Sequence, residues 1–123
     1  MRWHRLGLLL ALTGCAGSPD CTLIGCASQL TVELPAGTTA GTACVADVCT
    51  DQLVNGTLLV PLGRRAEGDT AQVTVTLPGT ATPYEGEVAL TRTRPNGASC
   101  PPVCVNGRAA VDVASGQVVA VPG

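Results

Sequence analysis

Hydrophobic and polar residues alternate along most of the chain after position 28, a pattern typical of half-buried β-strands. The alternation is clearest in segments 30–34 and 71–77, and it returns in segments 84–94, 108–113 and 117–121. Outside the first 14 residues, no helical period extends beyond a single turn. The residues expected to face inward are Leu30, Val32, Leu34, Val73, Val75, Leu77, Tyr84, Val88, Leu90, Ala109, Val111 and Val113.

Turn signals separate these strands. Asn55-Gly56 is the strongest, because both residues readily adopt the positive φ that a type I′ hairpin turn requires. Ala46-Asp47 is expected to form a second two-residue turn, although this dipeptide is less favourable for a type I′ turn. Loops rich in small and polar residues are expected at 35–41, 63–70 and 78–83.

Strands of this spacing predict an all-β fold, namely an antiparallel β-sandwich of immunoglobulin-like size over residues 21–123 with about seven or eight short strands. A small barrel is the alternative. In such a sandwich the first and last strands can lie side by side and parallel. The expected core contains mainly Val, Leu and Ala, with Tyr84 as its single aromatic residue. Because aromatic side chains usually supply much of the buried area, this core is thin and would need disulfides.

The first 14 residues have the layout of a signal peptide, with a basic head followed by an apolar stretch at 6–12. This stretch is far shorter than the ~20 residues needed to span a bilayer. The sequence Leu12-Thr13-Gly14-Cys15 resembles the bacterial lipobox, the recognition site of lipoprotein signal peptidase. The alternative is an ordinary secretory signal with an incidental cysteine.

The lipobox resemblance implies that residues 1–14 are removed and that Cys15 carries a diacylglycerol thioether. Residues 15–20 would then be the lipidated cysteine and a short tether in front of a single domain, 21–123. The resemblance also implies export and attachment to the bacterial cell membrane, or to the outer membrane if the cell has one. Stable attachment requires two or three acyl chains, as in this family.

Charge and composition exclude several classes of function. The chain has seven basic and nine acidic residues, and loss of Arg2 and Arg5 with the signal would leave five against nine, a net charge of −4. Nucleic-acid binding is therefore not expected, since it requires clustered positive charge. The mature chain would contain neither His nor Lys, which excludes the common general base and the Ser-His, Cys-His and Ser-Lys pairs. No cofactor is expected.

Six cysteines follow Cys15, and an even number in an exported chain of this length indicates a disulfide framework. A zinc site is the alternative, but it favours C-x2-C pairs, often with His, which this chain lacks. Across the expected turn at 46–47, Cys44 faces Cys49 at a non-hydrogen-bonded position, where side chains are closest. Pro101-Pro102 favours an extended path that separates its two flanking cysteines. We therefore expect the remaining pairs to be Cys21–Cys100 and Cys26–Cys104.

Segment 95–104, PNGASCPPVC, resembles the PNGxxCxPxC ending of small uncharacterised exported proteins from GC-rich bacteria. Segment 21–28 is similar to the start of the same proteins. This resemblance implies no particular activity.

Few side chains offer chemistry. Glu85 and Glu87 are two positions apart and share one face of a strand. We expect this face to be exposed to solvent, and the alternative is that the two glutamates form a catalytic carboxylate pair. Arg92 and Arg94 also share a face, and they could pair with the two glutamates across strands or bind an anionic surface.

The resulting hypothesis is a lipid-anchored, disulfide-stapled module of the cell envelope with a binding or structural role, and not an enzyme. Its partners would be the membrane, through the lipid on Cys15, and an envelope protein or the cell wall. The candidate contact surfaces are loops 95–104 and 63–69. One alternative is a protease inhibitor that presents the rigid loop 95–104. Another is a hydrolase of wall glycans that uses Glu85 and Glu87.

Overall fold

The computed structural model describes Cys21 and residues 24–63 and 70–122. Within these ranges the fold is all-β, and no helix is long and apolar enough to cross a membrane. The strands are β1 (Gln29–Glu33), β2 (Thr42–Val45), β3 (Val48–Thr50), β4 (Leu53–Val54), β5 (Thr57–Pro61), β6 (Thr70–Thr76), β7 (Tyr84–Ala89), β8 (Thr91–Thr93), β9 (Cys104–Asp112) and β10 (Gln117–Ala120).

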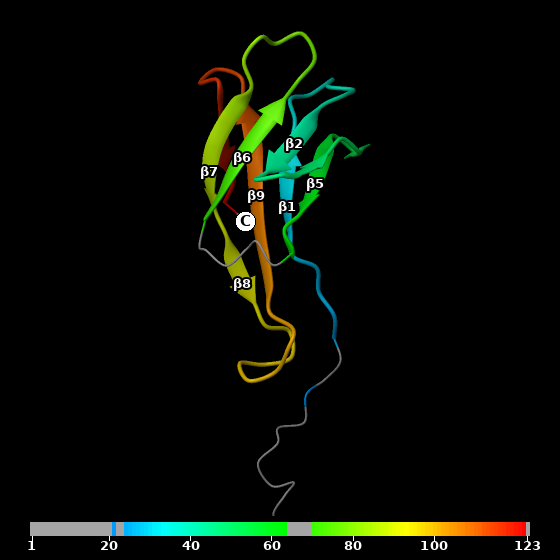
Figure 1. Cartoon of the computed structure of the whole chain (residues 1–123), viewed down its shortest axis with the longest axis vertical. Coiled ribbons are helices and arrows are strands. Elements are labelled where there is room, and N and C mark those ends of the chain that lie inside the picture. The colour runs from blue at the N-terminus through cyan, green and yellow to red at the C-terminus, as the bar shows by residue number, and fades with distance from the viewer. Residues whose placement is uncertain (1–20, 22–23, 64–69, 123) are drawn as a thin grey trace, which may run out of the picture.

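These strands form one mixed sheet that curls into a half-barrel (Figure 1). Nine strands follow the order β3-β2-β6-β7-β10-β9-β1-β5-β4, and β8 pairs with β9 beside this path. Most neighbours are antiparallel, whereas β1 runs parallel to β9 and β10 runs parallel to β7. The curl brings the two ends of the sheet together, since β2 and β3 contact β5.

The expected two-sheet sandwich is not confirmed, because hydrogen bonding continues from β3 to β4 within one sheet. Alternation along a strand determines which of its faces is buried. It does not determine whether that face meets a second sheet or the curled remainder of its own sheet. The first strand is parallel to β9 and not to the last strand, β10, which lies on the other side of β9.

The core consists of small aliphatic side chains. Its largest fully buried members are Leu30, Val32, Leu58, Val60, Val73, Val75 and Val88. Tyr84 packs against this cluster only partly buried, so no aromatic ring fills the centre. The expected inward position of Val113 is wrong: its side chain is 61% exposed. The reason is local, since β9 ends at Asp112 and the chain turns there, with Gly116 N–H donating to the Asp112 carbonyl at 2.9 Å.

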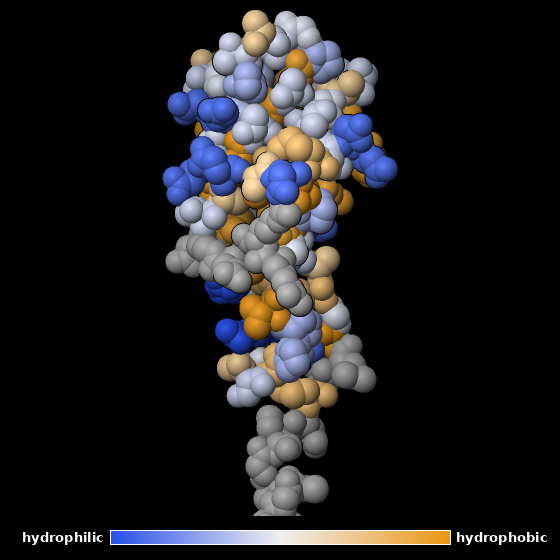
Figure 2. Space-filling model, viewed as in Figure 1, coloured by the Kyte–Doolittle hydropathy of each residue, from blue (hydrophilic) through white to orange (hydrophobic). Residues whose placement is uncertain are grey.

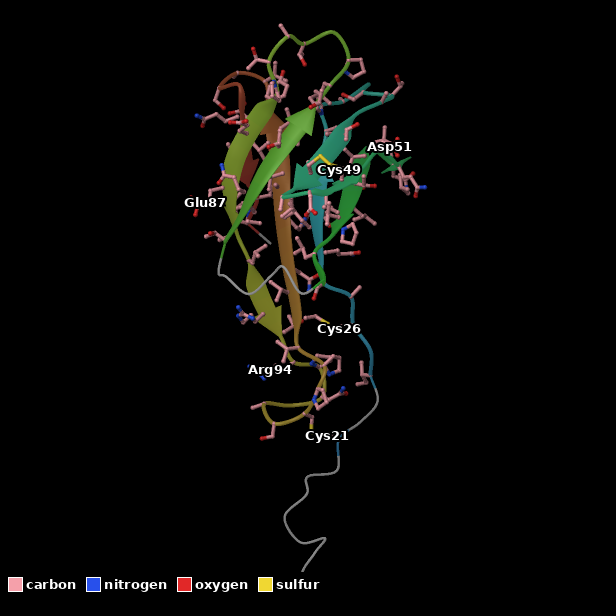
Figure 3. The ribbon with its side chains drawn as sticks, viewed as in Figure 1. Cys21, Cys26, Cys49, Asp51, Glu87 and Arg94 are labelled. Atoms are coloured by element: carbon pink, nitrogen blue, oxygen red, sulfur yellow. A yellow bond between two sulfur atoms is a disulfide. The ribbon has the colours of Figure 1, made fainter. Side chains whose placement is uncertain are left out.

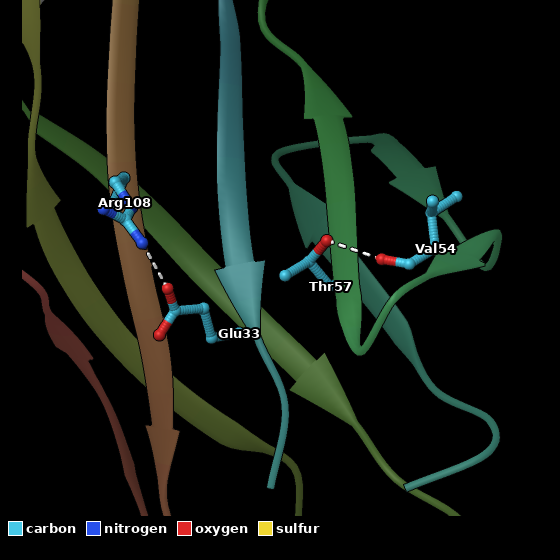
Figure 4. A network of polar contacts seen from close by, with 4 residues as sticks. All are labelled: Glu33, Val54, Thr57 and Arg108. Atoms are coloured by element: carbon cyan, nitrogen blue, oxygen red, sulfur yellow. Dashed lines mark hydrogen bonds and ion pairs between the residues drawn. The ribbon is translucent and has the colours of Figure 1, made fainter. Parts of the chain in front are cut away.

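Both expected two-residue hairpin turns are confirmed. Asn55 and Gly56 have φ values of 52° and 78°, and the Thr57 hydroxyl donates to the Val54 carbonyl at 2.8 Å beside this turn (Figure 4). In the other hairpin Ala46 has a φ of 55°, an unusual value for alanine. Val45 pairs with Val48 there, which sets the register of β2 against β3.

Candidate functional site

Three disulfides cross-link the domain, and their pairs are those expected from the sequence. Cys44 and Cys49 face each other across the β2–β3 hairpin with 4.0 Å between their Cα atoms. Cys21 is bonded to Cys100 and Cys26 to Cys104, with Cα separations of 5.6 and 6.1 Å. These two long-range disulfides lie one after the other, because segment 24–28 runs beside segment 100–105 before β1 pairs with β9.

We call the region formed by Cys21, residues 24–28 and residues 91–104 the stapled end. Figure 3 shows Cys21, Cys26 and Arg94 at this end, whereas Cys49, Asp51 and Glu87 lie in the opposite half of the molecule. Cys100 and Cys104 are buried, whereas their partners Cys21 and Cys26 are exposed, so each disulfide joins the packed interior of this end to its surface segment.

Hydrogen bonds close the stapled end around Asn96. Its side-chain amide donates from Nδ2 to the carbonyl oxygens of Ile24, at 2.9 Å, and Pro101, at 2.8 Å. The hydroxyl of Ser28, the residue directly before β1, accepts a hydrogen bond of 2.9 Å from the Val105 N–H of β9. Sequence reasoning missed both side chains, although Asn96 in the Pro-Asn-Gly sequence was a signal for more than a turn.

The loop of the stapled end is folded into turns. Gly97 N–H donates to the Arg94 carbonyl at 3.1 Å, and Cys100 N–H donates to the Gly97 carbonyl at 3.2 Å. Gly97 has a φ of 104°, a backbone conformation that favours glycine. The Pro101–Pro102 peptide is cis, so the extended polyproline path expected for this segment is wrong.

The surface of the stapled end combines apolar and cationic side chains. Ile24 is 54% exposed and Val103 is 40% exposed. Arg92 and Arg94 are exposed, and segments 24–28 and 91–104 contain no acidic residue. Figure 2 shows hydrophobic residues and strongly hydrophilic residues side by side in this lower part of the molecule.

Glu85 and Glu87 lie on an exposed face of β7, where they pair with Thr74 and Gln72 of β6. Figure 3 shows the Glu87 side chain pointing away from the sheet. Both glutamates are exposed, and neither lines any of the three described hollows.

The expected cross-strand pairing of Arg92 and Arg94 with the two glutamates is wrong. The segment expected as one strand breaks at Leu90, after which β8 pairs with β9 instead of following β7 along β6 and β10. Arg94 donates from Nη1 to the carbonyl of Ala98 at 3.3 Å, which keeps its side chain over the loop of the stapled end.

We call residues 35–42, 76–83 and 113–116 the distal end, because they lie at the opposite end of the sheet (Figure 1). Two adjoining hollows of about 400 and 270 Å³ lie here and share Ala40, Leu77 and Pro78. Most of their polar lining consists of threonines, and Asp51 is the one charged residue that lines them. The threonines are Thr38, Thr39, Thr42, Thr76 and Thr80.

A third hollow, of about 350 Å³, lies on the outer surface between Thr91, Asn106 and Pro122. Arg108 also lines it, but its guanidinium forms an ion pair with Glu33 on the neighbouring strand β1 (Figure 4). The positive charge of this hollow is therefore already compensated by the protein.

Among the described residues, no group of three or more His, Cys, Asp or Glu side chains could hold a metal ion. Two features of the sequence analysis lie outside the described residues. These are the lipobox, with Cys15 and its tether, and residues 64–69 of the loop proposed as a contact surface.

The fold and its cross-links define a small, disulfide-stapled all-β protein built on one curled sheet. In comparisons with protein-family models, curated proteins and solved structures, nothing matches this chain.

Proposed function

We propose that the protein is a lipid-anchored module of the bacterial cell envelope, with a binding or structural role and no catalytic activity. One observation carries the proposal: Cys21, only six residues after the lipobox cysteine, is covalently bonded to Cys100. Disulfides persist in exported proteins and are rare in the cytoplasm, so the framework supports the export that the lipobox implies.

The disulfides connect the proposed anchor firmly to the domain. Six residues span at most about 20 Å, so a lipid on Cys15 would hold the stapled end close to the membrane. Cys26–Cys104 adds a second link, which joins the segment in front of β1 to the first residue of β9; β1 and β9 are a parallel pair near the middle of the sheet. From Cys21 onward, a force on the anchor would therefore be transmitted through the two disulfides to the sheet.

The distal end supports the binding part of the proposal. Its two hollows are shallow, and their hydroxyl groups can both donate and accept hydrogen bonds. Such a surface suits a polar macromolecule, such as an envelope protein or a wall polymer, better than a small apolar ligand, which requires an enclosed site.

The two alternatives from the sequence analysis gain little support. A hydrolase needs converging carboxylates, whereas Glu85 and Glu87 lie on an open strand face. A protease inhibitor would present loop 95–104 to its target, but this loop lies beside the proposed anchor. A purified domain that inhibited common serine and cysteine proteases at stoichiometric amounts would revive the inhibitor hypothesis.

Lipid attachment is tested by expressing the full chain in a bacterial host, beside a Cys15→Ser variant. We expect the wild type to partition into detergent and its N-terminal peptide to carry diacylglycerol by mass spectrometry, while the variant stays soluble. The matched control is the double variant Cys44→Ser/Cys49→Ser, which removes a distant disulfide and should remain lipidated. An unmodified wild-type N-terminus would contradict the proposal.

The binding role is tested by cross-linking the protein in intact cells of its own host. Thr39→Arg places a bulky charge on the distal end, and Ser99→Arg places the same side chain on the exposed loop of the stapled end. A cross-linked partner that is lost in Thr39→Arg and kept in Ser99→Arg is expected. The reverse result would move the contact surface to the stapled end.

A further inference from the structure

We propose that the stapled end is a membrane seat, whose exposed Arg94, Ile24 and Val103 rest on anionic lipid headgroups while the distal end points away from the bilayer. The inference rests on the proposed lipid anchoring. It adds the orientation of the domain and the chemical class of lipid that the surface recognises.

The position of the anchor selects this end. The chain leaves the described domain at Cys21, which Cys21–Cys100 holds against the loop of the stapled end. At most about 20 Å of chain separates Cys21 from the acyl chains on Cys15. The distal end lies beyond the far end of β9, whose nine residues span about 26 Å, so it is out of reach of the same surface.

The composition of the stapled end fits a lipid surface. Its charged side chains are Arg92 and Arg94, and no acid lies within its segments 24–28 and 91–104 to repel anionic headgroups. Six acids are described elsewhere in the domain: Glu33, Asp47, Asp51, Glu85, Glu87 and Asp112. Because the whole mature chain has a net negative charge, the exposed Arg94 at the anchored end would orient it on an anionic bilayer.

Two of the six exposed large hydrophobic side chains in the described residues, Ile24 and Val103, lie on this same end beside Arg94. Ile24 is held there by Asn96, and Val103 lies between the disulfide-bonded Cys100 and Cys104. Both side chains are therefore presented on a rigid base, which loses little conformational freedom on contact with the membrane. Apolar side chains beside basic ones are typical of surfaces that lie in the membrane interface.

The proposed orientation on the membrane changes the role expected for loop 95–104. The sequence alone favoured it as a recognition loop, because it is rigid and exposed. In the anchored protein it would face the lipid headgroups, and the hollows of the distal end would remain accessible to partners.

The orientation can be measured by tryptophan fluorescence, because the mature chain contains no tryptophan of its own. Val103→Trp places a reporter on the seat. Val113→Trp is the matched control on the distal end, where the replaced side chain is 61% exposed. Each mature, lipidated variant, from which residues 1–14 have been removed, is incorporated into vesicles that contain phosphatidylglycerol and acyl-brominated phosphatidylcholine, since bromine quenches only nearby tryptophan.

We expect strong quenching and a blue shift for V103W, and no quenching for V113W. Equal quenching of the two reporters would contradict the proposed contact between the stapled end and the membrane. No quenching of V103W in protein that floats with the vesicles would contradict it too, and both results would leave the lipid anchor intact. Protein that does not float with vesicles would instead contradict the anchoring itself, so the two failures are distinguishable.

The lipid preference is measured in the V103W background. Replacing phosphatidylglycerol with neutral phosphatidylcholine should reduce the ratio of protein whose stapled end contacts the membrane to protein whose stapled end does not. Adding Arg94→Gln should reduce the same ratio by about five-fold. Raising the salt concentration should act in the same direction, because it screens exposed charges. Quenching that is indifferent to all three changes would overturn the electrostatic basis of the seat.

Discussion

Asn96 pairs with Ile24 much as one strand residue pairs with another: Nδ2 donates to the Ile24 carbonyl at 2.9 Å, and Oδ1 accepts from the Ile24 N–H at 3.1 Å. These residues lie 72 positions apart in the sequence. Because a primary amide carries both a donor and an acceptor, the side chain takes the place of a missing strand neighbour. The segment in front of β1 is thereby held on the stapled end.

Asn96→Asp keeps the accepting oxygens but loses both donated hydrogen bonds, and it places a negative charge beside two carbonyl oxygens. We expect a loss of about 1–3 kcal/mol in the free energy of unfolding, measured by urea denaturation. The control is Asn106→Asp, on the outer face of β9, where we expect less than about 0.5 kcal/mol. Equal effects of the two substitutions would contradict the special role of Asn96.

The two long-range disulfides should stabilise the domain non-additively. With Cys21–Cys100 intact, Cys26–Cys104 closes a ring of only about eleven residues, so removing it alone should cost about 3 kcal/mol. Removing both opens a loop of nearly eighty residues as well and should cost about 7 kcal/mol in total. Urea unfolding of the Cys→Ser pair variants tests this difference. If the losses of unfolding free energy caused by removing each disulfide alone added up to the loss caused by removing both, the two disulfides would act independently, which would contradict this prediction.

The hairpin disulfide Cys44–Cys49 closes a much shorter loop, with a sequence separation of 5. Its removal by a double Cys→Ser substitution should cost about 2 kcal/mol on the same entropic argument. The expected order of stability in urea is therefore wild type, then this variant, then the variant without both long-range disulfides. If the variant without Cys44–Cys49 were less stable in urea than the variant without both long-range disulfides, this order would be contradicted.

Gly86 allows β7 to approach β10 closely. A Cβ atom at this position would lie 1.9 Å from the Val118 carbonyl oxygen, which is backbone and cannot rotate away. Gly86→Ala should therefore destabilise the protein by about 3 kcal/mol or more, by forcing the two strands apart. Gly25→Ala is the matched control, because nothing lies within 4 Å of its added Cβ. A Gly86→Ala protein as stable as this control would rule out the close approach.

The Glu33–Arg108 ion pair connects β1 to β9 on the exposed face of the sheet. Since both side chains are partly exposed, we expect Glu33→Gln to cost less than about 1 kcal/mol. The difference from wild type should shrink when unfolding is measured at high salt, because exposed charges are screened. A large, salt-independent loss would indicate that Glu33 contributes mainly through packing.

Much of the local structure could be predicted because it depends on neighbours in the sequence. The alternation in 71–77 identifies β6, and Asn55-Gly56 identifies the turn between β4 and β5. The candidate site was less accessible to this reasoning. Loop 95–104 was recognised as rigid, but the hydrogen bonds from Asn96 to Ile24 join segments whose proximity no local pattern reveals.

The sequence by itself determined the all-β class, both hairpin turns and which face of most strands is buried, because these follow from side-chain alternation and from turn residues a few positions apart. Only the tertiary structure decided that β1 runs parallel to β9, that the strand expected over residues 84–94 is interrupted at Leu90, and that one sheet curls upon itself. These features depend on hydrogen bonds and contacts between distant segments. Many pairings can bury the same alternating faces, and the packing of the whole chain selects among them.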